Sequence, residues 1–160
     1  MEEWNLADLV RHGGVYHGVP GANVREVISG IADLLPSTLL ADREKLCLEI
    51  MEREALISTG VGMGIALPHP RNPVLKEGER PLVAVAFPSQ PVDWNTPDGG
   101  KVHTVFLLIS SSVKQHLGTL SKINFLCQQE EFYSLISRKA GQEEIIAAIA
   151  RAENAWASGY

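Results

Sequence analysis

The segment Ser58-Thr-Gly-Val-Gly-Met-Gly-Ile-Ala-Leu-Pro-His-Pro70 carries the strongest structural signals in the chain. Its three glycines, at alternate positions, allow backbone conformations that other residues avoid and a close approach to a neighbouring group. Residues 65–67 are apolar and predict a short strand. Pro68 cannot donate a hydrogen bond to a sheet, so we expect the strand to end there and to present His69 in a fixed pose.

Two well-known glycine-rich nucleotide motifs do not fit this segment. A Walker loop requires a glycine, four residues and then Gly-Lys-Ser/Thr, and no lysine stands at that place. The dinucleotide-binding fingerprint fails because Ile65 stands where its third glycine belongs. The sequence therefore argues against a nucleotide site of either kind.

Length and composition indicate one globular domain spanning residues 1–160, with a core over about 6–152. The chain has 160 residues, 45% apolar and 21% charged, which is ordinary for a single domain. Its apolar runs are far shorter than the ~20 residues of a membrane span, so we expect no membrane insertion. A formal net charge of −5 argues against nucleic acid as a partner. The amino terminus lacks the basic start and apolar run of a signal peptide, which predicts a cytoplasmic location.

The pattern of apolar residues predicts an α/β fold, a three-layer sandwich in which a mixed β-sheet is flanked by helices on both faces. Helical spacing and capping signals predict helices over 24–35, 41–56, 113–128, 130–139 and 142–152. Apolar runs predict strands over 65–67, 82–87 and 102–109, with a short extended piece over 91–94. Residues 12–21 are glycine-rich and predict a loop, and the tail from residue 154 is expected to fray.

The central segment resembles the active-site signature of the type 2 enzyme IIA domains of the bacterial phosphoenolpyruvate-dependent sugar phosphotransferase system. This family includes mannitol, fructose and nitrogen-regulatory branches. The matching residues are the charged run 52–54, then Thr59, Gly60, Gly64, Ile65, Ala66, Pro68 and His69. The family usually has a small residue after the histidine, whereas this chain has Pro70. The resemblance extends over about 6–149.

A neutral imidazole can act as a nucleophile near neutral pH, and the resemblance implies that His69 accepts a phosphoryl group from the phosphocarrier protein HPr or a paralogue. By the same resemblance His116, early in the helix after the longest strand, stabilises the transferred group. Arg53 and Thr59 match family positions whose side chains could bind phosphate oxygens. We expect no cofactor and no metal, because the phosphoryl donor is a protein and no paired acidic residues beside the loop indicate magnesium.

Alternatives to these roles stay open at the level of sequence. A histidine at an apolar strand is often structural, and Arg53 could be a solvated charge paired with Glu49. As a stand-alone chain the protein most resembles the nitrogen-regulatory branch, whose phosphorylation state is read by other proteins. It could instead be the IIA subunit of a fructose- or mannitol-type transporter that passes the phosphoryl group to a IIB partner. A third possibility is a non-catalytic interaction module in which Pro70 prevents transfer.

Overall fold

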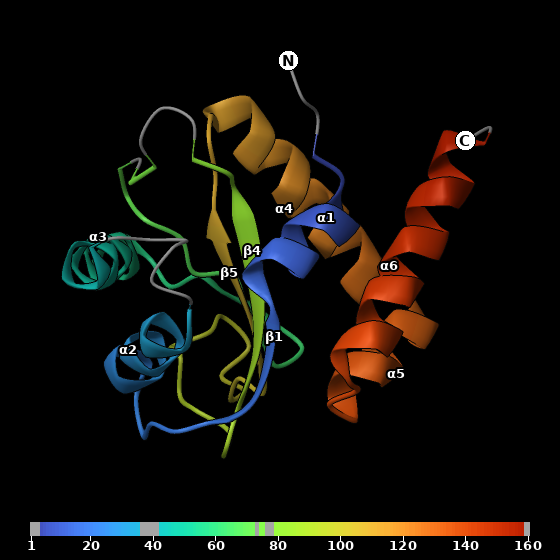
Figure 1. The fold of residues 1–160 in the computed structure, drawn as a ribbon. Coiled ribbons are helices and arrows are strands. Elements are labelled where there is room, and N and C mark those ends of the chain that lie inside the picture. The colour runs from blue at the N-terminus through green and yellow to red at the C-terminus, as the bar shows by residue number, and fades with distance from the viewer. Residues whose placement is uncertain (1–3, 36–41, 73, 76–78, 159–160) are drawn as a thin grey trace.

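A mixed five-stranded sheet separates two layers of helices in the computed structural model (Figure 1), which describes residues 4–35, 42–72, 74–75 and 79–158. The strands are β1 (Val15–Val19), β2 (Gly60–Gly62), β3 (Ile65–Ala66), β4 (Leu82–Pro88) and β5 (Thr104–Ile109). The helices are α1 (Leu6–Gly13), α2 (Val24–Leu34), α3 (Arg43–Leu56), α4 (Val113–Cys127), α5 (Glu130–Ser137) and α6 (Gln142–Ala157). Helices α1, α4, α5 and α6 cover one face of the sheet, and α2 and α3 cover the other. The predicted three-layer α/β sandwich is confirmed.

The strand order is β1-β4-β5-β3-β2. β1 is parallel to β4, β4 is antiparallel to β5, β5 is parallel to β3, and β3 is antiparallel to β2. The two longest strands, β4 and β5, pair from Leu82 opposite Ile109 to Ala86 opposite Val105. Every residue of both strands is buried. Their continuous apolar character follows from the helices on both faces.

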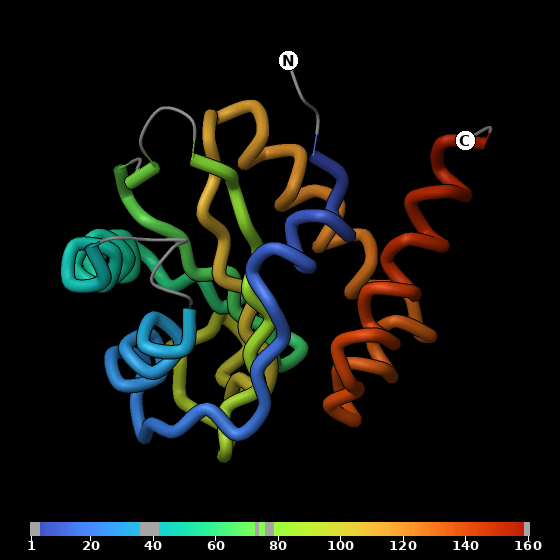
Figure 2. The backbone as a smooth tube through the Cα atoms, in the orientation of Figure 1, coloured from blue at the N-terminus to red at the C-terminus, as the bar shows by residue number. Residues whose placement is uncertain are grey.

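Alternate residues of the central strands belong to two separate cores, because successive side chains of a strand point to opposite faces. Val83 and Phe87 pack with α1, α4, α5 and α6. Ala84 and Ala86, one residue out of phase, pack with α2 and α3. Figure 2 shows the backbone of the sheet running between these two groups of helices.

The carboxylate of Glu153 connects α1 to α6 through hydrogen bonds. The backbone N–H groups of Leu6 and Ala7 donate to the side chain of Glu153 at 2.8 and 2.9 Å. Both groups lie in the first turn of α1, where no acceptor within the helix is available and a negative charge is favourable. Lys122 donates to the same carboxylate at 3.0 Å. Glu153 therefore connects α1, α4 and α6 on one face of the sheet.

The prediction of a loop over 12–21 is wrong, because β1 lies within this range as an edge strand of the sheet. Gly14 and Gly18 have φ angles of 95° and 64°, which are values that favour glycine, and they gave the range its loop-like composition. The strand is held by partners far along the chain, with Val15 opposite Val85. Such pairing has no signature in local composition.

The expectation of a frayed tail from residue 154 is also wrong for residues 154–157, while residues 159 and 160 lie outside the described residues. Helix α6 continues to Ala157. The ring of Trp156 meets that of Phe125 of α4 edge-on, with their centroids 5.3 Å apart. Aromatic pairs of this geometry stabilise a contact beyond the area that they bury. The last turns of α6 therefore have an anchor on α4.

Three smaller differences concern element boundaries. β2 forms inside the glycine-rich segment, where no strand is predicted, and pairs with β3. Residues 91–94 contribute only an isolated antiparallel bridge between Val92 and Val102. The helix predicted over 41–56 begins at Arg43, and Ala41 lies outside the described residues.

Candidate functional site

His69 lies just beyond the end of β3, and hydrogen bonds fix the two main-chain residues before it. The carbonyl of Pro68 accepts from the N–H of Leu108 at 3.0 Å, while Pro68 has no N–H to donate. The N–H of Leu67 donates to the carbonyl of Thr59 at 3.0 Å. The proline therefore ends the strand as predicted, and the sheet presents the imidazole in a defined position.

Hydrogen bonding fixes the tautomer of the His69 ring. Its Nδ1 lies 2.9 Å from the carbonyl oxygen of Leu67. Because a carbonyl oxygen can only accept, Nδ1 must carry the proton. In the neutral ring Nε2 then holds the lone pair, and within the described parts of the chain it has no hydrogen-bond partner.

A second imidazole lies against the first. His116 is in the first turn of α4, which Ser112 caps through its side chain. The ring centroids of His116 and His69 are 4.5 Å apart and their planes are inclined by 58°. Nδ1 of His116 lies 3.3 Å from the hydroxyl of Ser110, just after β5. The structure therefore brings together two predicted site residues that are far apart in sequence.

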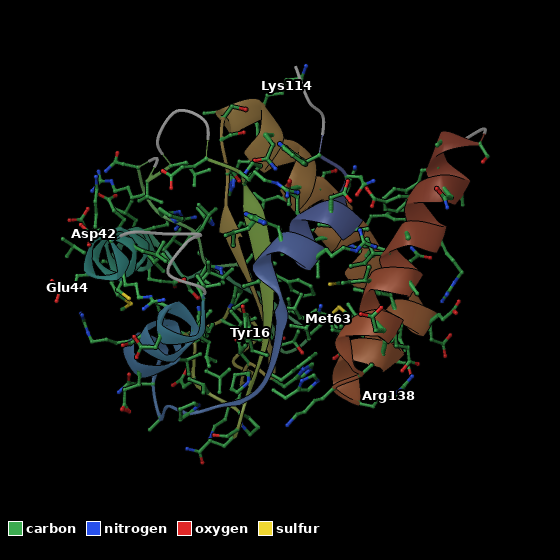
Figure 3. The ribbon with its side chains drawn as sticks, viewed as in Figure 1. Tyr16, Asp42, Glu44, Met63, Lys114 and Arg138 are labelled. Atoms are coloured by element: carbon green, nitrogen blue, oxygen red, sulfur yellow. The ribbon has the colours of Figure 1, made fainter. Side chains whose placement is uncertain are left out.

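A pocket of about 250 Å³ lies beside the two rings. Its wall is formed by the last turns of α3, the segment after His69, the end of β5 and the start of α4. Lys114, labelled near the top of Figure 3, lies at the start of α4, next to the pocket-lining Val113. Arg53, predicted as a site residue, lines this pocket together with His69 and His116.

The pocket is positively charged in a protein whose formal net charge is −5. Arg53 and Arg71 both line it, and none of the described Asp or Glu side chains does. Neither arginine takes part in an ion pair among the described residues. Guanidinium groups bind phosphate oxygens through two parallel hydrogen bonds. The pocket is therefore suited to a small dianion such as a phosphoryl group.

Hydrogen bonds at α3 hold the side chain of Arg53 and the main chain of Arg71. Nη1 of Arg53 donates at 2.8 Å to the carbonyl of Ile57, just past the helix end, where carbonyls lack partners within the helix. The alternative ion pair between Arg53 and Glu49 is not formed. Glu49 instead accepts two hydrogen bonds at 3.0 Å from the backbone and side chain of Asn72, and its carbonyl accepts from the N–H of Arg71 at 3.1 Å. The segment that carries Arg71 is thereby tied to α3.

Burial lowers the pKa of both imidazoles. For His69 burial is the largest cause; the Leu67 carbonyl opposes it, the charge of Arg53 lowers the pKa further, and that of Glu54 raises it. For His116 the pKa falls from 6.5 to about 4, first by burial and then by the charges of His69 and Arg53. At pH 7 both rings are therefore neutral, which is the form that acts as a nucleophile.

Stability should fall as the pH drops from about 6.5 to about 4, and His116 should account for part of this loss. A histidine whose pKa is lowered on folding binds more protons when unfolded, so stability rises with pH between the folded and unfolded values. Urea unfolding of wild type and His116→Gln at several pH values measures the effect. The variant should show a shallower decline between pH 6.5 and 4 and the same pH dependence as the wild type above pH 7. An equal decline in both proteins would contradict the assignment.

Thr59 is not brought into the pocket. Its side chain is 5% exposed, and its hydroxyl donates to the carboxylate of Glu54. The indole N–H of Trp94 also approaches the hydroxyl oxygen at 3.3 Å. The hydroxyl that was expected to bind phosphate oxygens is therefore engaged elsewhere, because α3 presents a carboxylate beside it.

Sequence reasoning missed Arg71 and Ser110 as parts of the site. The position of Arg71, two residues after His69, could have suggested a role in the site. It was missed because Arg71 begins a charged stretch that looks solvated. Ser110 is one of three consecutive serines that look like a helix-capping signal. Its contact with the His116 ring depends on how the chain turns between β5 and α4.

The sequence model of the family described as "Phosphoenolpyruvate-dependent sugar phosphotransferase system, EIIA 2" matches residues 10–152. The chain belongs to this family. The resemblance found in the segment around His69 is confirmed for most of the length of this type 2 EIIA protein.

Relatives of the type 2 EIIA protein come from regulatory and transport branches. It is 33% identical over 121 residues to a nitrogen regulatory protein of Pseudomonas aeruginosa, which covers 74% of this chain and 77% of that protein. It is 30% identical over 109 residues to the fructose-specific EIIABC component of Bacillus subtilis, which covers 67% of this chain but 17% of that larger protein. The chain is therefore close to nitrogen regulatory proteins and also related to fructose-type EIIA domains.

Solved structures share the fold of this EIIA protein. The crystal structure of the nitrogen regulatory protein IIA-Ntr from Neisseria meningitidis aligns with a TM-score of 0.77 at 23% identity, covering 89% of this chain and 97% of that one. The structure of IIA mannitol from Escherichia coli aligns with a TM-score of 0.68 at 16% identity, covering 86% and 96%. Among the described residues, no helix is both long and apolar enough to cross a membrane.

Proposed function

We propose that this protein accepts a phosphoryl group on Nε2 of His69 from a phosphorylated carrier protein, HPr or a paralogue. The hydrogen bond from Nδ1 to the Leu67 carbonyl carries this proposal, because it leaves the lone pair on Nε2. The neutral ring at pH 7 and the two pocket arginines support the same conclusion. The protein then passes the group on or signals through its phosphorylation state, as a nitrogen-regulatory phosphocarrier in the cytoplasm.

The transfer balances without release of a proton. The Nε2 lone pair of His69 attacks the phosphorus of the donor's phosphohistidine. A P–N bond forms on His69 while the donor's P–N bond breaks, and the electron pair of the broken bond stays on the donor ring nitrogen. The positive charge of the donor ring, protonated at its other nitrogen, moves to the His69 ring. The Leu67 carbonyl stabilises this charge, because Nδ1–H becomes a stronger donor in a cationic ring.

The other pocket residues bind and orient the transferred phosphoryl group. Phosphoryl transfer requires alignment and neutralisation of charge on the equatorial oxygens. Arg53 on α3 and Arg71, two residues after His69, supply cationic donors to the pocket. The His116 ring, 4.5 Å away between centroids, restricts the orientation of His69 and borders the phosphoryl group.

Intact-protein mass spectrometry tests the proposal. The protein is incubated with phosphoenolpyruvate, enzyme I and HPr, and separately with the nitrogen-branch paralogues of those proteins. We expect a mass gain of one phosphoryl group that is lost on mild acid treatment, as a phosphohistidine requires. No gain with either donor system would overturn the proposal and would favour a non-catalytic interaction module in which Pro70 prevents transfer.

A transport role has a specific observation in its favour. One structural neighbour is a complex of enzyme IIA mannitol with phosphorylated enzyme IIB mannitol from Escherichia coli, with a TM-score of 0.64 to this chain. In that role the phosphoryl group of His69 would pass to a separate IIB protein. Adding purified fructose- or mannitol-type IIB proteins to the phosphorylated protein distinguishes the roles, because only a transport subunit loses its label to IIB rapidly.

Exposed apolar side chains beside the pocket fit the docking of a protein donor. Val113 and Leu117 on α4 are 76% and 59% exposed, next to His116. Leu56 and Ile57, beside Arg53, are 61% and 68% exposed. Such residues around a charged pocket suit a protein partner whose phosphohistidine enters the pocket.

The substitution Leu117→Asp should raise KM for the phosphorylated donor about tenfold, as expected when one well-packed interface residue is lost. The kcat should change little, because Leu117 is not among the pocket-lining residues. Steady-state transfer at varied donor concentration measures both constants. Leu48→Asp is the matched control, since Leu48 is also 59% exposed but, unlike Leu117, is not adjacent in sequence to a residue that lines the pocket. Equal effects of the two substitutions would contradict docking at this face.

A further inference from the structure

The carboxylate of Glu54, which does not line the pocket, accepts three hydrogen bonds. It accepts from the backbone N–H of Thr59 at 3.2 Å and from the hydroxyl of the same residue. It also accepts from the indole N–H of Trp94 at 3.2 Å. Thr59 and Trp94 are buried, with 5% and 1% exposure. The Glu54 carboxylate therefore binds both the backbone N–H and the hydroxyl of Thr59. The indole N–H of Trp94 fixes the carboxylate itself.

The residue that Glu54 holds is the first link of a path to the His69 ring. The carbonyl of Thr59 accepts from the N–H of Leu67 at 3.0 Å. The carbonyl of Leu67 accepts from Nδ1 of His69 at 2.9 Å. Hydrogen bonds and the backbone of Thr59 and Leu67 thus connect the last turns of α3 to the imidazole, through residues just before β2 and just after β3.

We infer that Glu54 is a positioning residue for His69, acting through Thr59 and Leu67 to keep the proton on Nδ1 and the lone pair on Nε2. The inference rests on the proposed function for its effect on phosphoryl transfer. Glu54 does not line the pocket, so it is not a catalytic residue in the sense of touching the transferred group.

Two physical effects make this path sensitive to the charge of Glu54. Hydrogen bonds to a charged acceptor are stronger than those to a neutral one, so the carboxylate holds Thr59, and through it Leu67, more firmly in place. The charge also acts on the ring directly: it raises the pKa of His69, whereas the charge of Arg53 lowers it. As the ring becomes cationic during transfer, a carboxylate at the end of the path favours the product.

Glu54→Gln tests the inference, because glutamine keeps the size of the side chain but loses the charge and one acceptor oxygen. Ring nitrogens of His69 are observed by ¹⁵N NMR in the unphosphorylated protein. We expect wild type to show the Nδ1–H tautomer, and the variant to show a mixture of tautomers and a lower pKa for His69. Glu52→Gln is the matched control, since Glu52 lies two residues away on the same helix and is exposed.

A second pair of variants keeps the test decisive should Glu54→Gln fold poorly. Thr59→Val removes the hydroxyl while keeping the shape and the backbone, and Thr59→Ser restores the hydroxyl. We expect the valine variant to show mixed tautomers and the serine variant to resemble the wild type. An unchanged Nδ1–H tautomer in both Glu54→Gln and Thr59→Val would overturn the inference.

The kinetic readout separates this inference from the proposed function. In Glu54→Gln the kcat should fall about tenfold, the worth of one hydrogen bond to a charged group, with KM for the donor unchanged. A raised KM with an unchanged kcat would overturn the positioning role. If the wild type takes up no phosphoryl group, the proposed function fails, and the NMR signals alone then decide whether Glu54 positions the ring.

Discussion

The His69→Ala variant should take up no phosphoryl group under conditions that fully label the wild type. The substitution removes Nε2, the nitrogen whose lone pair is left free by the hydrogen bond to the Leu67 carbonyl. The other pocket imidazole, His116, contacts the hydroxyl of Ser110 and comes from a different element, so it does not replace the lost nitrogen in position. Labelling from phosphoenolpyruvate through enzyme I and HPr measures the effect, with intact mass as the readout.

His12→Ala is the control for this experiment, because His12 lies on α1 and does not line the pocket. It should be labelled like the wild type. His116→Ala should still be labelled, but more slowly. Label that persists on His69→Ala would remove His69 as the acceptor and would require another nucleophile in the pocket.

Replacing a pocket arginine should give the second-largest loss. Arg53→Ala and Arg71→Ala should each slow single-turnover phosphorylation by a factor of about 10² to 10³, the usual cost of removing one preorganised donor from a developing anion. Both side chains line the pocket without an ion-pair partner among the described residues. Rapid-quench measurement of the labelled fraction against time gives the rate directly.

Two comparisons separate charge from geometry at these positions. Arg53→Lys and Arg71→Lys keep the positive charge but lose the planar guanidinium group and its paired donors. They should therefore recover only part of the wild-type transfer rate. Arg25→Ala, on the exposed surface of α2, should transfer at the wild-type rate. A wild-type rate in Arg71→Ala would assign that side chain to the surface rather than to the transferred group.

The parts of the fold that follow local rules could be predicted from the sequence. The apolar runs of β4 and β5 predict buried central strands, and Pro68 predicts the strand end before His69. Helix caps such as Asn23 and Ser112 are visible as residue types, and both cap through their side chains. These features depend on residues close together in the chain.

The parts that depend on distant partners could not be predicted. β1 exists because β4 offers it an edge, and the last turns of α6 are held by Phe125 on another helix. Thr59 looked like a phosphate ligand because its sequence position matches the family signature. In the structure Glu54 takes its hydroxyl, and Arg71 lies at the pocket instead. The family signature located the site but did not distinguish contact with the pocket from support behind it.

The bonds from the first turn of α1 to Glu153 of α6 have a consequence for how this fold is joined to other proteins. They place the first turn of α1 beside the last turns of α6. A domain whose first and last helices are in contact can be joined to further domains without disturbing its interior. In the Bacillus subtilis transporter component the matching region is 17% of the whole. Hydrogen bonds between the first and last helices would let one architecture make up most of a protein, as in the Pseudomonas aeruginosa relative, or a small part of a larger one.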